Sequence, residues 1–342
     1  MITFFQIWSR DKKKGYDVKN IVANLKWVTD LNFSAGQLNF DLIYQDKTYL
    51  PALGSIVKFY WDHHKVFYGY VFNAKLTHEK VVSVVAYDKT RYLKNQDSIV
   101  WKTGTIADRF NNVCKRAGIS HKVINKPKHK VAAEVCDGKS YFDMLKSAIS
   151  KTLRSTGHMY FIYANYSRVE LCRAPRKKLK LILDPDSGMT SFTFSKDIDN
   201  TANVVKIIQK NVKKSKSKTA TASGDNPSKT SFKSVTKKMP SVKRWGKLQI
   251  TQNKKSKANH AQMVKQAKNV LKQKDLANKT LTIDCLGNLD LVAGNSVEVK
   301  IVGYKTIKNC GILKATHNFG TDYNCSLEMK VMASWLANDS TE

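Results

Sequence analysis

The chain has 342 residues, of which 42% are hydrophobic and 10% aromatic. This composition can bury two or three ordinary cores and excludes a protein that is disordered throughout. Its 59 Lys and Arg residues against 27 Asp and Glu leave a net charge of +32, which predicts either a polyanionic partner or acidic protein neighbours in an assembly.

Residues 1–95 have the period of an antiparallel sheet. Leu38, Phe40 and Leu42 alternate with polar residues, as in a strand with one buried face. Further strands are predicted around a tight turn and beyond it, at residues 57–61, 66–76 and 81–87. About five short strands at this spacing favour a small closed or nearly closed barrel, which leaves no long unpaired edge.

The pattern changes to helices and short strands at residues 96–175, which we predict to be a compact α+β insert domain. Apolar residues recur at helical spacing over 105–117, and Gly118 follows as a stop signal. A second helix is predicted at about 140–155, with Gly157 as its stop. A hairpin around Asn165-Tyr166-Ser167 is then expected, with strands at residues 160–164 and 168–173.

Residues 210–244 contain eleven Lys or Arg and one Asp, Asp225, with many Ser and Thr. Burial in such a segment does not offset the entropy lost on ordering, so we predict a flexible basic loop. A basic helix is expected at about 257–274. A second β module is predicted at 176–209 and 245–342, with strands at residues 179–183, 191–195, 280–284, 296–302, 311–317 and 325–331.

The cysteines and the chain start bear on the cellular environment. No C-x-x-C pair occurs among the six cysteines, whose apolar or strand-like surroundings predict reduced thiols at Cys114, Cys136, Cys172, Cys285, Cys310 and Cys325. No run approaches the roughly 18 apolar residues of a membrane span. Residues 1–8 lack the features of a signal peptide and are interpreted as a strand. We therefore expect no membrane association.

Three motifs partly match the patterns of phosphate-binding or metal-binding sites. Asp137-Gly138-Lys139-Ser140 ends like a phosphate-binding loop, but the earlier glycine of that pattern would fall at Ala133, and a capped helix N-terminus explains Ser140. His78-Glu79 lacks the second histidine of a zinc protease. His63-His64 has only Asp62 nearby, which favours an exposed turn over a metal site.

Other motifs partly match the catalytic patterns of hydrolases. Gly188-Met189-Thr190-Ser191 lacks the second glycine of a nucleophile elbow, so Ser191 is expected to be an ordinary strand residue. Glu134 with Asp137, or Asp184 with Asp186, would supply the two carboxylates of a glycosidase. Acids beside Gly and Pro are more often turn formers. We assign no catalytic, cofactor-binding or metal-binding residue and predict that the protein is not an enzyme.

Nucleic-acid binding is the stronger alternative function. The basic region at 210–274, with Phe232 and Trp245, supplies charge that neutralises phosphates and some stacking surface. Aromatic residues are sparse within it, however, and no helix-turn-helix, zinc-finger or RNP pattern occurs. A cell-wall hydrolase is the third hypothesis.

Several short segments, taken in order, resemble the baseplate hub proteins of contractile phage tails. The chain is similar to the XkdQ-like proteins of defective Bacillus prophages and, more distantly, to the phage Mu hub and the base of type VI secretion spike proteins. The resemblance covers nearly the whole chain except the basic loop, and its segments are residues 86–93, 103–107, 140–145 with Gly157, 200–205, 245–249 and 281–288.

This resemblance implies a homotrimeric ring in which each subunit carries two similar barrels, so that three chains present about six equivalent faces. The expected fold is α+β, mainly β: two similar small β-barrel modules, a helical insert and a flexible Lys/Ser/Thr-rich loop. Core packing is expected for residues 297–301 and for five aromatic side chains, those of Trp8, Trp27, Phe40, Phe59 and Trp61.

The resemblance also implies a mechanical function. The hub would adapt a threefold spike to a sixfold tail tube in a phage or a bacteriocin-like particle. Its partners would be the tail tube, central spike, baseplate wedge and tape-measure proteins, with nucleic acid only as cargo in the lumen. Such a protein is synthesised in the bacterial cytoplasm and resides in the tail baseplate.

Overall fold

The computed structural model describes residues 1–44, 49–212, 230–254, 259–301 and 306–331. These residues form a mainly β, α+β protein, as the sequence predicts. They divide into two compact units, one of residues 1–195 with 280–331 and the other of residues 196–279.

The first unit begins with antiparallel strands, which are β1 (Ile2–Trp8), β2 (Gly15–Asp17), β3 (Val22–Asp30), β4 (Gln37–Ile43), β5 (Ile56–Trp61), β6 (His64–Leu76) and β7 (Val81–Asp88). The alternation predicted for β4 is confirmed, because Leu38, Phe40 and Leu42 are buried in one core. Phe59 and Trp27 are buried in the same core. Trp8 and Trp61, also expected in the core, are half-buried.

An α+β segment with its own core follows. It contains η1 (Lys89–Lys94), β8 (Gln96–Trp101), β9 (Gly104–Thr105), α1 (Ile106–Arg116), β10 (His121–Val123), β11 (Lys130–Val131), β12 (Glu134–Ser140), α2 (Tyr141–Thr156), β13 (Tyr160–Asn165) and β14 (Arg168–Arg173). Both predicted helices and the predicted hairpin are confirmed. Thr105 and Asp108 form a capping box at the start of α1, and Gly157 takes a left-handed φ of 72° after α2.

The first unit is completed by strands from the C-terminal part of the chain. They are β15 (Lys178–Leu183), β16 (Met189–Asp197), β20 (Asn278–Leu286), β21 (Ser296–Val299), β22 (Ile307–Phe319) and β23 (Asn324–Val331), with the turn η2 (Pro185–Ser187) between β15 and β16. Their side chains form a third core.

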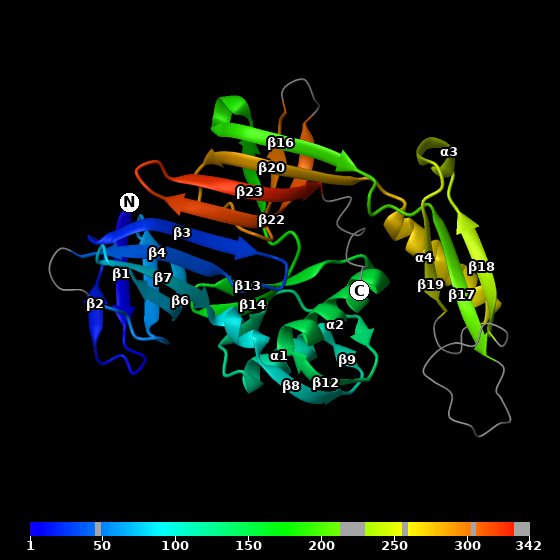
Figure 1. Ribbon diagram of the computed structural model, residues 1–342, viewed down its shortest axis with the longest axis horizontal. Coiled ribbons are helices and arrows are strands. Elements are labelled where there is room, and N and C mark those ends of the chain that lie inside the picture. The colour runs from blue at the N-terminus through cyan, green and yellow to red at the C-terminus, as the bar shows by residue number, and fades with distance from the viewer. Residues whose placement is uncertain (45–48, 213–229, 255–258, 302–305, 332–342) are drawn as a thin grey trace. The chain divides into compact units, whose positions relative to one another are not determined.

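Strand β3 pairs with β22 and joins both groups of strands into one 13-stranded sheet (Figure 1). The order is β16-β20-β23-β22-β3-β4-β7-β6-β5-β1-β2, while β21 pairs with both β22 and β15. In the described residues the strand pairing closes no barrel, so the sheet is open where the sequence predicts barrels. To close an N-terminal barrel, β3 would have to pair with β1. It pairs with β22 instead.

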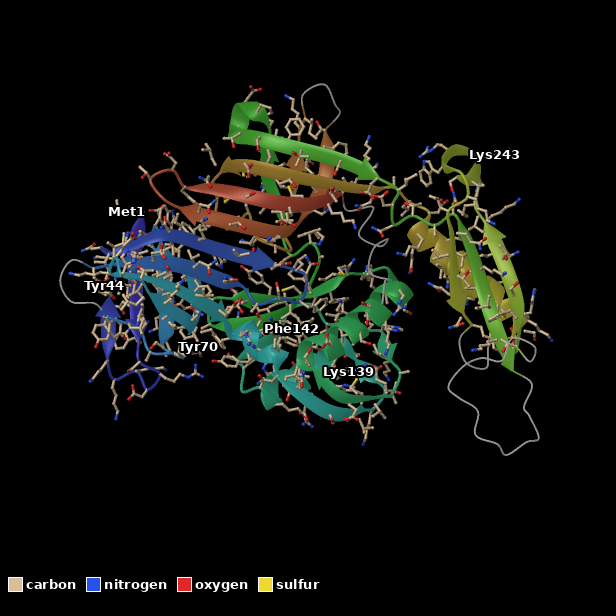
Figure 2. The ribbon with its side chains drawn as sticks, viewed as in Figure 1. Met1, Tyr44, Tyr70, Lys139, Phe142 and Lys243 are labelled. Carbon is tan, nitrogen blue, oxygen red and sulfur yellow. The ribbon has the colours of Figure 1, made fainter. Side chains whose placement is uncertain are left out.

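The second unit consists of a three-stranded sheet, β18-β17-β19, with helix α4 packed against it. Its elements are β17 (Val204–Val212), β18 (Thr230–Lys238), α3 (Val242–Trp245), β19 (Gln249–Asn253) and α4 (His260–Lys274). Met263, Ala267 and Leu271 of α4 form a core with Val205 and Ile207 of β17. Figure 2 labels Lys243 on α3.

The prediction of a flexible loop at 210–244 is wrong for much of this range. Residues 230–238 form β18 and residues 242–245 form α3. Strand β18 buries only Val235, so its polar sequence carries almost no apolar signal. Residues 213–229 lie outside the described residues. The boundaries predicted for the second β module also change, because residues 196–279 form the second unit, inserted between β16 and β20.

None of the helices within the described ranges is both long enough and apolar enough to cross a membrane.

Candidate assembly interface

The histidine motifs lie in exposed turns. His63 lies in the β5–β6 turn, as predicted, with Asp62 and His63 at positive φ angles of 45° and 64°, and His64 is the exposed first residue of β6. His78 is exposed between β6 and β7. In the part of the chain that the structure describes, no group of three or more His, Cys, Asp or Glu side chains is placed to hold a metal ion.

The Asp137-Gly138-Lys139-Ser140 motif ends β12 rather than forming a phosphate-binding loop. Ser140 caps α2, as predicted, because its Oγ accepts a hydrogen bond from the Asp143 N–H at 3.1 Å. Lys139 is exposed (Figure 2).

Glu134 binds two cationic side chains, Arg109 and Lys151. Burial raises the pKa of Glu134, but the hydrogen bonds from Lys151 and Arg109 together hold it below its ordinary value. A carboxylate kept ionised in this way is a poor proton donor for glycoside hydrolysis.

Ser191 and Asp184 make structural contacts. Ser191 lies on strand β16, as predicted, and its Oγ donates to Asp284 Oδ2 at 2.7 Å. Asp184 caps η2, and its hydrogen bonds from Ser187 lower its pKa. The turn-forming role expected for Asp184 is confirmed.

Two sets of strands in the first unit have the same order. The N-terminal module, defined as β1 and β3 to β7, has the order β1-β5-β6-β7-β4-β3. The C-terminal module, defined as β15, β16 and β20 to β23, has the order β15-β21-β22-β23-β20-β16. Taken along the chain, each strand of one module therefore has a counterpart in the other. The modules differ in that β1 is antiparallel to β5, whereas β15 is parallel to β21.

Backbone hydrogen bonds extend this correspondence to single residues. Val71 of β6 exchanges two of them with residues 54–55, of 2.7 and 2.9 Å. Ile312 of β22 exchanges the same two with residues 294–295, both of 2.9 Å. Residues 54 and 294 are both glycines in the left-handed region, with φ of 82° and 93°. Val71 and Ile312 thus occupy the same position in the two modules.

An irregularity of the sheet also recurs at this position. The register of β6 against β7 shifts between Val71 and Asn73, and that of β22 against β23 shifts between Ile312 and Lys314. Such bulges are specific features of a sheet, so their recurrence at one place is informative. Following the pairing onward, the buried residues Leu38, Phe40 and Leu42 of β4 correspond to Leu281, Ile283 and Cys285 of β20.

The two modules meet in a ladder that we call the junction, in which β3 runs antiparallel to the C-terminal half of β22 (Figure 1). It extends from Leu25 opposite Phe319 to Asp30 opposite Lys314. The Ala293 N–H also donates to Thr29 Oγ1 at 3.0 Å.

A buried histidine lies at the centre of the junction. The His317 ring packs against Trp27, its cross-strand neighbour, with 4.8 Å between ring centroids. Its Nε2 lies 3.1 Å from the Leu291 carbonyl oxygen, and its Nδ1 lies 2.8 Å from the Tyr323 hydroxyl. These partners fit a neutral ring that donates from Nε2 and accepts at Nδ1. Burial lowers the pKa of His317 to about 4.

An aromatic cluster joins the cores across the junction. Phe319, at the end of β22, packs in the core of the N-terminal module. Its ring centroid lies 5.0 Å from that of Phe59, 4.9 Å from that of Trp61 and 4.8 Å from that of Tyr323. A side chain at Gly287 would lie 2.3 Å from the Tyr323 ring, so only glycine fits there. The junction is therefore both a continuous sheet and a shared core.

The second unit is strongly basic. Residues 196–279 contain 22 Lys or Arg against four Asp. Lys265, Lys268 and Lys272 are exposed on α4, opposite its buried stripe. Phe232 of β18 is exposed in the sheet of the same unit. This arrangement offers phosphate-neutralising charge with little stacking surface.

Comparison with known proteins identifies relatives. A family described as YqbQ-like matches residues 25–330. The phage-like element PBSX protein XkdQ of Bacillus subtilis (strain 168) is 25% identical over 280 residues, which are 81% of this chain and 79% of that protein.

Two solved structures have a similar fold. The 43 kDa tail protein of prophage MuSo2 from Shewanella oneidensis gives a TM-score of 0.68 at 13% identity, covering 97% of this chain and 99% of that one. The E. coli c3393 protein, a component of the type VI secretion system, gives a TM-score of 0.52 at 9% identity, covering 91% of this chain and 73% of that one.

These matches confirm the resemblance to XkdQ-like tail proteins that the short segments indicated. The family match includes β3 to β7, the α+β segment and nearly all of the C-terminal module. The chain therefore belongs to the YqbQ-like family.

Proposed function

We propose that this protein is the structural hub of a contractile-tail baseplate and forms a homotrimeric ring that adapts a threefold spike to a sixfold tail tube. The observation that carries this proposal is the repeated strand order of the two modules, with the same bulge in each. We interpret the modules as two similar copies of one fold.

The physical reason is symmetry. A threefold and a sixfold body share one docking geometry only when an adapter repeats its docking surface twice per chain. Three chains with two corresponding modules each present six such surfaces. The junction fixes how the two modules of one chain are oriented, because a shared core resists deformation.

The relatives support a place in a tail. XkdQ belongs to a phage-like element, and the MuSo2 protein is a tail protein. In such a baseplate the expected neighbours are the tail tube, central spike, wedge and tape-measure proteins. The particle is a phage tail or a bacteriocin-like tail, and DNA would be cargo in the lumen of the former. No catalytic step is assigned to this chain.

Light scattering of the purified protein, alone and mixed with tube and spike proteins from the same gene cluster, tests the proposal. The expected mass is three times 38.7 kDa, and particle images should show a ring with six similar lobes. A monomer under every one of these conditions would falsify the hub proposal.

Nucleic-acid binding by the second unit is the second candidate, favoured by its 22 Lys or Arg against four Asp. Reversing the charge of Lys265, Lys268 and Lys272 should then weaken DNA retention and reduce its salt dependence. Reversal of three exposed lysines in the first unit, Lys12, Lys13 and Lys14, is the matched control. Equal retention by both triple variants would reject specific use of α4.

A further inference from the structure

Each module contains a strand that corresponds to one of the two junction strands and lies at an edge of the described sheet. Within a chain, β3 of the N-terminal module pairs with the C-terminal half of β22 in the C-terminal module. The counterpart of β3 is β16, and the counterpart of β22 is β6. The described sheet ends at β16 on one side, so β16 is an edge strand.

The corresponding half of β6 is an edge as well. Residues 73–76 pair with β7 on one side. On the other side, within the described ranges, β5 and the residues before it pair with β6 as far as Val71. In β22, residues beyond the equivalent Ile312 pair with β3. Long exposed edges promote strand addition, and β16 has nine residues.

Exposed apolar side chains mark both edges. Phe192 of β16 is 40% exposed and Leu76 of β6 is 49% exposed. Their counterparts in the junction are Leu25 and His317, which are buried. Covering the β6 edge in the same way would bury the exposed Leu76 side chain, which removes apolar surface from water.

The register of β16 follows from its contact with β20. Ser195 Oγ lies 2.7 Å from Thr280 Oγ1. Thr280 occupies in β20 the position of Gln37 in β4, and Gln37 pairs with Val28 of β3. Ser195 therefore corresponds to Val28.

We infer that the C-terminal half of β16 of one subunit pairs antiparallel with residues 73–76 of β6 in the next copy of this chain, with Ser195 opposite Lys75. In the junction, Val28 lies opposite Thr316, and Thr316 has the position of Lys75. The inference rests on the proposed hub function. The same strand pairing would then join successive modules both within a chain and between chains. A repeated head-to-tail contact of this kind forms a ring when its rotation closes.

Disulfide trapping tests the register. Facing residues of adjacent strands have the Cα separation that a disulfide requires, and the six native cysteines are buried. The double variant Lys75→Cys/Ser195→Cys should form covalent dimers and trimers on oxidation that reduction reverses. The control Lys75→Cys/Thr190→Cys, with the second cysteine five positions away on the same strand, should form at least tenfold less. Equal or greater trapping in the control overturns the register.

A second variant tests the edge without cysteines. Leu76→Asp should abolish the trimer mass while the circular dichroism spectrum and melting curve of the subunit are kept. Val135→Asp, at a residue that is 71% exposed on β12, should leave the trimer intact. A trimer that survives Leu76→Asp and resists trapping sinks this inference but leaves the hub proposal standing. A wild-type protein that never forms a trimer sinks both.

Discussion

Two buried groups in the first unit should give opposite pH dependences of stability. Burial lowers the pKa of His317 to about 4 from 6.5. Burial raises the pKa of Asp88 to about 6 from 3.8, against opposing hydrogen bonds from Thr90. The unfolded chain therefore takes up the His317 proton below pH 6.5, whereas the folded protein takes up the Asp88 proton below pH 6.

The sign of each contribution follows by linkage. The His317 contribution is fully present above pH 6.5 and is lost as the pH falls towards 4. A shift of about 2.5 units is equivalent to about 3 kcal/mol of unfolding free energy. The Asp88 penalty is fully present above pH 6 and is relieved as the pH falls towards 3.8, which restores about 3 kcal/mol. In the wild type the two effects nearly cancel.

Single variants with neutral polar side chains should separate them. Asp88→Asn leaves only the His317 effect, so its stability should fall between pH 7 and pH 4 relative to wild type. His317→Gln leaves only the Asp88 effect, so its stability should rise. The difference in unfolding free energy between the variants should change by about 5 kcal/mol over this range.

Urea unfolding at a series of pH values, followed by tryptophan fluorescence, measures this difference. Trp27 packs against His317 and reports on the junction itself. Contributions of all other titrating groups are common to both variants and cancel in the comparison. A difference between the variants that stays constant from pH 7 to pH 4 would refute the assignment of these two residues.

Three further predictions concern packing and thiols. Phe319→Ala should cost about 3–5 kcal/mol in urea unfolding, whereas Phe232→Ala, at a residue that is 58% exposed, should stay within about 0.5 kcal/mol; equal costs would contradict the shared core. Gly287→Ala should lower the melting temperature because its Cβ would overlap the Tyr323 ring, while Gly320→Ala, with no heavy atom within 4 Å, should not. A thiol reagent should modify none of the six buried cysteines rapidly in the native protein and all six in urea, so that one fast native thiol would count against the packing described.

Local signals made the helices and turns predictable from the sequence. The apolar repeat of α1 ends at Gly118, whose φ is 65°, and Ser140 caps α2 where the motif placed it. The alternation of Leu38, Phe40 and Leu42 fixed the buried face of β4. Each of these features depends on residues within a turn or two of the chain.

Features that depend on distant pairing could not be predicted. Strand β18 looked like a loop because Val235 is its one buried side chain. The junction joins β3 and β22, which lie near opposite ends of the sequence. Neither strand contains a local sequence signal that predicts this pairing. The family resemblance implied two similar modules, but their residue-by-residue correspondence is hidden in the sequence, because Phe40 and Leu42 correspond to Ile283 and Cys285. Equivalent positions keep burial and register but not residue type.

The second unit occupies the connection between β16 and β20, whose counterpart in the N-terminal module is the short connection at residues 31–36. At this connection the C-terminal module therefore carries a whole folded unit, whereas the N-terminal module has a loop of six residues. A trimer would contain six modules but three copies of the basic second unit. One gene would therefore supply both a sixfold and a threefold repeat. Partner proteins that bind the second unit could then evolve separately from partner proteins that bind the modules.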